Sequence, residues 1–74
     1  MKILITGATG FIGRQVALHL RERGHDIVAL SRDLKTAPVR MPIACPLFEW
    51  RGADRPPPRE AFEGVDAVVH LAGE

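Results

Sequence analysis

Three glycines near the start of the chain, Gly7, Gly10 and Gly13, have the spacing of a turn that can hold phosphate groups. They follow a short apolar run at residues 3–6 and precede an amphipathic pattern, which predicts a strand, a glycine turn and a helix in that order. Gly7 would turn the chain off the strand, Gly10 would let a pyrophosphate approach the backbone, and Gly13 would let the helix lie tight against the sheet. The free N–H groups at the helix start would bind the phosphates.

The spacing is G-x-x-G-x-x-G rather than G-x-G-x-x-G, so the three glycines alone are a weak signal. The alternative is an ordinary glycine-rich turn between a strand and a helix. A second apolar run at the right distance favours a dinucleotide-binding βαβ unit over that alternative. A P-loop is excluded, because no Lys followed by Ser or Thr comes after the last glycine to hold phosphate and metal.

Composition and charge are those of an ordinary globular chain, with 74 residues, 46% hydrophobic residues and a net charge of +1. This length allows one small domain, and so low a charge favours neither nucleic acid nor a membrane surface as a partner. The single cysteine, Cys45, cannot form an internal disulfide, and the three scattered histidines do not make a metal site. No apolar stretch has the length of a membrane span or a signal peptide. We therefore expect a cytoplasmic protein.

Four strands are expected to position the glycine turn. The second and the fourth have continuous apolar runs typical of parallel strands covered on both faces. The strands are predicted at residues 2–6, 26–31, 47–50 and 66–71, and the third could begin as early as residue 43. A helix at residues 11–23 would face the sheet with Ile12, Gly13, Val16, Ala17 and Leu20, and Gly24 would end it. A helical turn at residues 33–37 and a short helix at residues 59–62 complete the prediction.

The stretch Thr6-Gly7-Ala8-Thr9-Gly10-Phe11-Ile12-Gly13 resembles the N-terminal fingerprint of the extended and atypical short-chain dehydrogenases/reductases. These proteins are the nucleotide-sugar epimerase and dehydratase relatives. Residues 66–74 resemble the fourth-strand motif of the same family, and the Leu-Ala-Gly-Glu ending resembles a subgroup of nucleoside-diphosphate-sugar epimerases. The resemblance implies a cofactor site made of the following residues: Gly7, Thr9, Gly10, Phe11, Ile12, Gly13, Leu71, Ala72 and Gly73.

The end of the second predicted strand bears on the choice between NADP and NAD. In the pattern of the family, an Asp or Glu at this position accepts a hydrogen bond from the ribose 2′-hydroxyl of NAD. Ser31 occupies the position, so the charge that would repel a 2′-phosphate is absent. Arg32 follows it, and its guanidinium can pair with that phosphate and stack on the adenine. These residues predict NADP, with NAD less favoured; the alternative is that Arg32 is a plain surface residue and Asp33 binds the ribose.

The resemblance implies an α/β architecture, half of a doubly wound Rossmann fold whose parallel sheet has the strand order 3-2-1-4. Because members of the family have several hundred residues, the 74 residues are expected to be the N-terminal part of a dinucleotide-binding domain. A complete small protein is the alternative. The open edge beside the fourth strand would pair with another chain, so a homodimer formed through this edge is expected.

The resemblance also implies a reaction that these residues do not carry out by themselves. The family transfers hydride with a Tyr-x-x-x-Lys pair, but the chain has no tyrosine and its lysines, Lys2 and Lys35, lie outside such a motif. No catalytic residue is therefore assigned; His70 is expected to be structural and Trp50 to be a packing residue. The leading hypothesis is the NADP-binding segment of an oxidoreductase or epimerase, with nucleotide sugars as a substrate class. The alternatives are a non-catalytic NADP-binding sensor and a segment that binds nothing alone.

Overall fold

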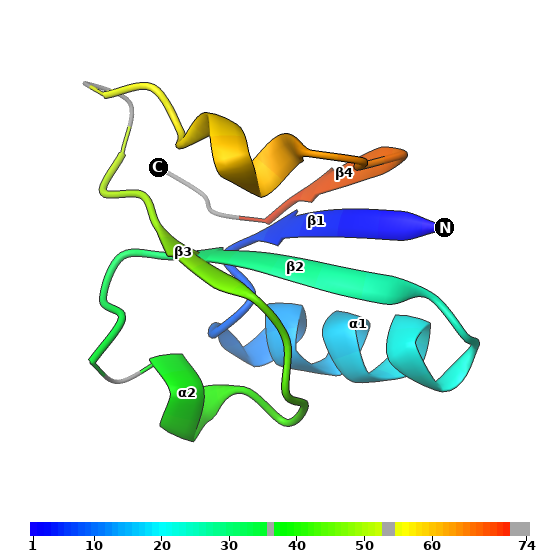
Figure 1. Cartoon of the computed structure of the whole chain (residues 1–74). Helices are drawn as coiled ribbons and strands as arrows, with labels where there is room; N and C mark the ends of the chain where they lie inside the picture. The colour runs from blue at the N-terminus through cyan, green and yellow to red at the C-terminus, as the bar shows by residue number, and fades with distance from the viewer. Residues whose placement is uncertain (36, 53–54, 72–74) are drawn as a thin grey trace.

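The computed structural model describes residues 1–35, 37–52 and 55–71, in which strands and helices alternate along most of the chain (Figure 1). A five-residue strand leads through the glycine turn into the longest helix, and the later elements are short. The elements in chain order are β1 (Lys2–Thr6), α1 (Phe11–Glu22), β2 (Asp26–Ser31), α2 (Ala37–Arg40), β3 (Leu47–Glu49), the 3-10 helix η1 (Arg59–Phe62) and β4 (Ala67–His70).

The four strands form one parallel sheet in the order β3-β2-β1-β4, which confirms the predicted order and the α/β class. Because β1 lies between β2 and β4, its carboxyl end faces the carboxyl ends of both neighbours. Thr6 lies opposite Leu30 on one side and opposite His70 on the other. The glycine turn therefore leaves the sheet at its centre, where the strand order reverses and where open α/β sheets bind ligands.

Helices cover the two faces of the sheet unequally (Figure 1). On one face, Ala17 of α1 packs with Ile3 and Ile5 of β1 and with Ile27 and Ala29 of β2, all of them buried. The other face is covered by the shorter η1, whose Ala61 packs on a buried cluster of Leu4, Val28 and Leu30. Because β1 and β2 are covered on both faces, they carry the continuous apolar runs that the sequence shows.

Two predicted core positions face solvent. Ile12 is 59% exposed, although the helical spacing placed it on the face toward the sheet. The first turn of α1 lies close to the turn at Gly7 and Ala8, which a Cβ on Gly13 would contact, and Ile12 is not among the residues packed in the core. In β4, Val68 is 52% exposed. This strand is at the edge of the sheet and alternates between half-buried and exposed residues, so the prediction of a strand buried on both faces was wrong for it.

Several element boundaries also differ from the predicted ones. β3 begins at Leu47 and ends one residue before Trp50, while β4 is shorter than predicted at both ends. The helix predicted at residues 33–37 is displaced to Ala37–Arg40, although the N–H of Ala37 donates to the carbonyl of Asp33 and closes one turn there. Pro38 lies in the first turn of α2, where its missing N–H removes no helical hydrogen bond.

Candidate functional site

The turn between β1 and α1 depends on one glycine with a positive φ angle. Gly7 has φ of +71°, a left-handed conformation that residues with a Cβ rarely adopt. Its carbonyl accepts a hydrogen bond from the N–H of Gly10 at 3.1 Å, which closes the turn. The chain consequently reverses within three residues of the strand end and begins α1 at the carboxyl edge of the sheet. The prediction that Gly7 turns the chain off the strand is confirmed.

Gly13 is required by packing inside the protein. A Cβ built on Gly13 would lie 2.0 Å from the carbonyl oxygen of Gly7 and 2.8 Å from the Cα of Ala8. Both atoms belong to the backbone, so neither can rotate out of the way. The tight approach that was predicted is present, but its partner is the turn that precedes the helix and not the strands of the sheet.

At Gly10, unlike Gly13, the packing of the protein does not require a glycine. Its φ of −74° and ψ of 172° suit any residue, it is exposed, and a Cβ there would meet only the oxygen of Gly7 at 3.4 Å. Neither the conformation nor the packing of the described chain therefore demands glycine at this position. The absence of a side chain leaves the backbone open to a ligand at the start of α1, as a bound pyrophosphate would need.

The start of α1 is electrostatically suited to an anion. Gly10 is the N-cap residue and supplies no side-chain hydrogen bond, and the first turn contains no acidic residue. The N–H groups of Phe11, Ile12 and Gly13 precede the first intrahelical hydrogen bond, which the N–H of Arg14 donates to Gly10. Phe11 is 69% exposed beside them, and Thr9 is half-buried in the turn.

The carboxyl ends of β1 and β4 are joined by a polar contact. The hydroxyl of buried Thr6 lies 2.7 Å from Nδ1 of His70, and the N–H of Leu71 donates to the same hydroxyl and to the carbonyl of Thr6. His70 thus holds two strand ends together, in line with the structural role expected for it. The contact also places Leu71 beside the glycine turn. The other predicted residues of this stretch, Ala72 and Gly73, lie outside the described residues.

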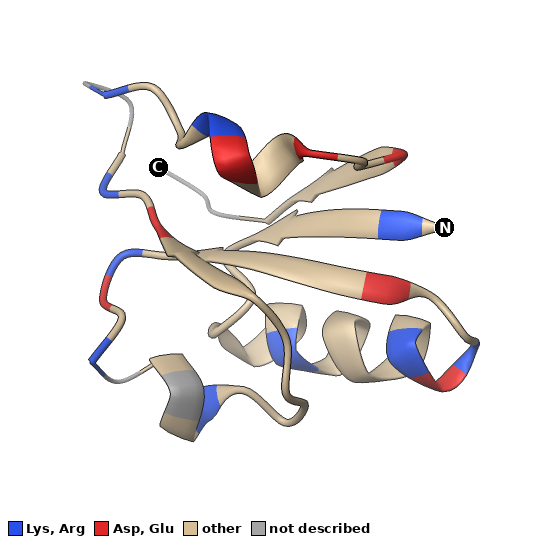
Figure 2. Cartoon of the chain, in the orientation of Figure 1, with Lys and Arg blue, Asp and Glu red and all other residues tan. Residues whose placement is uncertain are grey.

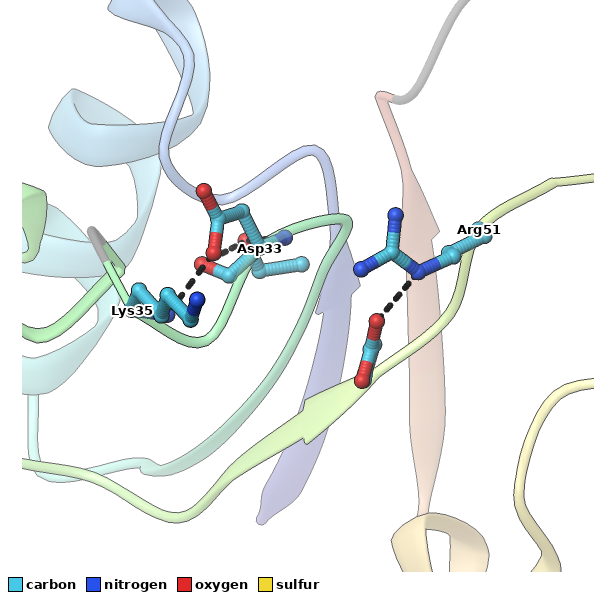
Figure 3. Close-up of polar contacts among 5 residues, drawn as sticks. Asp33, Lys35 and Arg51 are labelled. Atoms are coloured by element: carbon cyan, nitrogen blue, oxygen red, sulfur yellow. Dashed lines mark hydrogen bonds and ion pairs between the residues drawn. The ribbon is translucent and has the colours of Figure 1, made fainter.

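At the end of β2, the structure separates the roles of Ser31, Arg32 and Asp33. The Ser31 hydroxyl is buried and accepts a hydrogen bond from the N–H of Asp33 at 3.3 Å. The Asp33 carboxylate accepts from the N–H of Lys35 at 2.8 Å, as Figure 3 shows. Arg32 is exposed, and its guanidinium has no hydrogen bond or ion pair with any residue that the structure describes. Among the charges around β2, the Arg32 guanidinium is therefore open to a ligand.

Two contacts near this edge were not predicted. The hydroxyl contact of Thr6 depends on the register between β1 and β4, which the sequence does not specify. An ion pair joins Glu49, the last residue of β3, to Arg51 (Figure 3), and Glu49 is in register with Ser31. The sequence could have placed Glu49 beside the end of β2 only if the strand order had been known, because Glu49 is the last residue of its strand.

Other polar groups of the described chain do not add to the site. The pKa of the half-buried Cys45 thiol is raised by burial, and the charge of Arg21 opposes this only in part. In residues 1–35, 37–52 and 55–71, no cluster of His, Cys, Asp and Glu could hold a metal ion, and no helix is long and apolar enough to cross a bilayer. The alternating basic and acidic residues of the loop between β2 and α2 (Figure 2) include Arg32 and Asp33 and so belong to the site already described.

Comparison with known proteins gives a consistent family. The model of the NAD dependent epimerase/dehydratase family matches residues 3–74. The chain is 39% identical over 72 residues to 2-alkyl-3-oxoalkanoate reductase from Stenotrophomonas maltophilia, covering 95% of this chain and 21% of that protein. It is 33% identical over 81 residues to UDP-glucose 4-epimerase from Neisseria meningitidis serogroup B, covering 97% of this chain and 24% of that protein.

The chain is also similar in fold to a solved structure. MoeE5 in complex with UDP-glucuronic acid and NAD superimposes on the whole chain with a TM-score of 0.69 and 31% sequence identity, and the match covers 23% of MoeE5. The chain thus spans about a quarter of MoeE5, and about a fifth to a quarter of each of the two curated relatives.

Proposed function

This chain belongs to the NAD dependent epimerase/dehydratase family, and from that premise we propose that it binds NADP through its glycine turn and the end of β2. The pyrophosphate would lie over Gly10 against the N–H groups of Phe11, Ile12 and Gly13. The open backbone at Gly10 is the observation that carries this proposal, because nothing else in the described chain explains a glycine there. Gly7 and Thr9 shape the turn on one side, and Leu71 with Ala72 and Gly73 would border the cofactor on the other.

The preference for NADP rests on the charges at the end of β2. Ser31 presents no carboxylate, so the group that would accept the ribose 2′-hydroxyl of NAD is missing there. The Asp33 carboxylate is already engaged by the N–H of Lys35, which argues against Asp33 as its replacement. Arg32 is left as an exposed guanidinium, and a guanidinium pairs with phosphate through two parallel hydrogen bonds.

We further propose that these residues form the N-terminal part of a dinucleotide-binding domain in a longer oxidoreductase or epimerase. The share of its relatives that the chain covers supports this reading. The Tyr-x-x-x-Lys chemistry of the family would come from other residues, since the chain has no tyrosine. Nucleoside-diphosphate sugars are the proposed substrate class, supported by the UDP-glucose 4-epimerase relative and by the UDP-glucuronic acid bound to MoeE5.

A titration of the chain with NADP and with NAD tests the cofactor proposal. Replacing Arg32 by Ala should weaken NADP binding by about 1.5–3 kcal/mol, roughly 10- to 150-fold in Kd, while NAD binding changes little. The matched control is Arg59→Ala, which removes an exposed arginine from η1 on one face of the sheet. Equal affinities for the two cofactors that Arg32→Ala leaves unaltered would overturn the NADP preference.

A further inference from the structure

An acidic residue lies one strand away from the place where a ribose-binding acid is expected. Ser31 at the end of β2 is paired in register with Glu49 at the end of β3. Adjacent strands are about 4.8 Å apart, and residues in register point to the same face. Ala29 and Leu47, two residues earlier on each strand, both pack in the core beneath α1, so Ser31 and Glu49 share that face. A carboxylate side chain thus belongs to the residue next to Ser31 on the neighbouring strand, on the same face of the sheet.

The carboxylate of Glu49 is neutralised by its own neighbour. Nε of Arg51 donates to Oε2 of Glu49, and Figure 3 shows the guanidinium standing over the end of β3. Both side chains are accessible, at 65% for Arg51 and 40% for Glu49. No described residue accepts a hydrogen bond from the two terminal nitrogens of this guanidinium. An anion at the end of β2 would therefore find donors on Arg51 as well as on Arg32.

We propose that the Glu49–Arg51 ion pair tunes the choice between NADP and NAD in this chain. With the pair intact, Arg51 is a second cation for the 2′-phosphate, and its charge prevents Glu49 from repelling that phosphate. Without Arg51, the Glu49 carboxylate becomes an uncompensated negative charge beside Ser31. It can then accept a hydrogen bond from the ribose 2′-hydroxyl, as an acid at the end of β2 does in NAD-preferring proteins. This inference rests on the proposed binding of the adenosine ribose at the end of β2.

Substituting Arg51 and substituting Glu49 should therefore change the affinity for NADP in opposite directions. Arg51→Ala removes a donor and exposes a carboxylate, so NADP binding should weaken about tenfold or more while NAD binding stays equal or tightens. Glu49→Gln frees Arg51 and removes the negative charge, so NADP binding should tighten about threefold to tenfold. In the double variant both charges are absent, so NADP binding should be weakened less than in Arg51→Ala alone.

The experiment titrates the 74-residue chain and its variants with NADP and with NAD at constant ionic strength, and measures each Kd by isothermal titration calorimetry. Arg32→Ala is included in the series, with Arg59→Ala and Glu60→Gln as matched charge controls on η1. Thermal unfolding monitored by circular dichroism verifies that each variant is folded. NAD affinity serves as the internal reference, because NAD lacks only the 2′-phosphate.

The possible outcomes separate this inference from the proposed function. Opposite shifts in NADP affinity for Arg51→Ala and Glu49→Gln, with flat controls, would support the tuning role. If Arg32→Ala weakens NADP selectively but the Glu49 and Arg51 variants match the controls, this inference is overturned and the proposed function stands. If the unaltered chain binds NADP no better than NAD and Arg32→Ala changes nothing, both are overturned. Parallel losses for NADP and NAD in Arg51→Ala would show a general structural role and refute the inference.

Discussion

Replacing Gly13 by Ala and replacing Gly10 by Ala should affect different properties of the protein, stability in the first case and cofactor binding in the second. A methyl group on Gly13 would lie 2.0 Å from the oxygen of Gly7, well inside the 3.0 Å below which Cβ atoms essentially never approach other atoms. The start of α1 must therefore move away from the turn in Gly13→Ala. In Gly10→Ala the methyl group meets only that oxygen at 3.4 Å, an ordinary contact. We expect Gly13→Ala to lose stability and Gly10→Ala to lose cofactor binding.

The expected loss for Gly13→Ala follows from two opposing effects. Forcing a methyl group into a packed site costs about 1–3 kcal/mol, and the upper value applies because the clashing atoms belong to the backbone. The higher helix propensity of Ala offsets about 1 kcal/mol. The net loss of about 2 kcal/mol corresponds to a fall in Tm of roughly 8–16 °C in a domain of this size. Gly10→Ala should cost only about 0.5 kcal/mol, the difference between Gly and Ala as N-cap residues.

Urea unfolding followed by the fluorescence of Trp50, the single tryptophan, measures both stabilities. Titration with NADP measures binding of the folded variants, and Gly10→Ala should bind at least tenfold more weakly because its Cβ occupies the space of a phosphate. A stability of Gly13→Ala within 0.5 kcal/mol of the unaltered chain, about the scatter of a neutral substitution, would refute the packing argument. NADP binding by Gly10→Ala with full affinity would refute the assignment of the pyrophosphate.

Three further outcomes are expected. Thr6→Val removes the hydroxyl that contacts His70 and Leu71, so the free energy of unfolding in urea should fall by about 1–3 kcal/mol; an unchanged midpoint would contradict this. Burial raises the pKa of the Cys45 thiol above its ordinary value, so alkylation at pH 8 should be slower in the folded chain than in urea. The stability due to the neutral thiol is fully present below the pKa of the unfolded thiol and is lost as the pH rises through the higher pKa of the folded one. We also expect self-association through the exposed edge of β4; sedimentation should show a monomer for Val68→Lys, and a monomeric unaltered chain at high concentration would exclude the dimer.

The order of the strands was predictable because the apolar runs, the glycine turn before the helix and the handedness of crossover connections all indicate the same arrangement. The apolar runs of β1 and β2 are continuous, as parallel strands under helices require, and they flank a helix that begins after a glycine turn. Right-handed crossovers then leave one arrangement for the first two strands. The family resemblance added the position of β4 beside β1, which propensity alone does not provide.

The exposure of individual residues was less predictable, because it depends on what lies opposite. Ile12 has the spacing of a core residue, yet the first turn of its helix lies close to the turn at Gly7 and Ala8, and Ile12 is exposed. Val68 belongs to an apolar run, yet its strand is at the edge of the sheet. Helical and strand periodicity describe which residues share a face of an element, and they do not say which part of that face meets a neighbour.

The polar contacts at the carboxyl edge were the least predictable part, and they also carry the most functional information. The Asp33 carboxylate is engaged by a backbone N–H and the Glu49 carboxylate by a guanidinium, so each local negative charge has a local partner. The Arg32 guanidinium, by contrast, has no hydrogen bond or ion pair with the residues that the structure describes. A ligand that brings a phosphate to this edge would complete the pairing, whereas a ribose hydroxyl would leave the guanidinium unpaired. The arrangement of charges is thus a second argument for the proposed preference for NADP, beside the absence of an acid at Ser31.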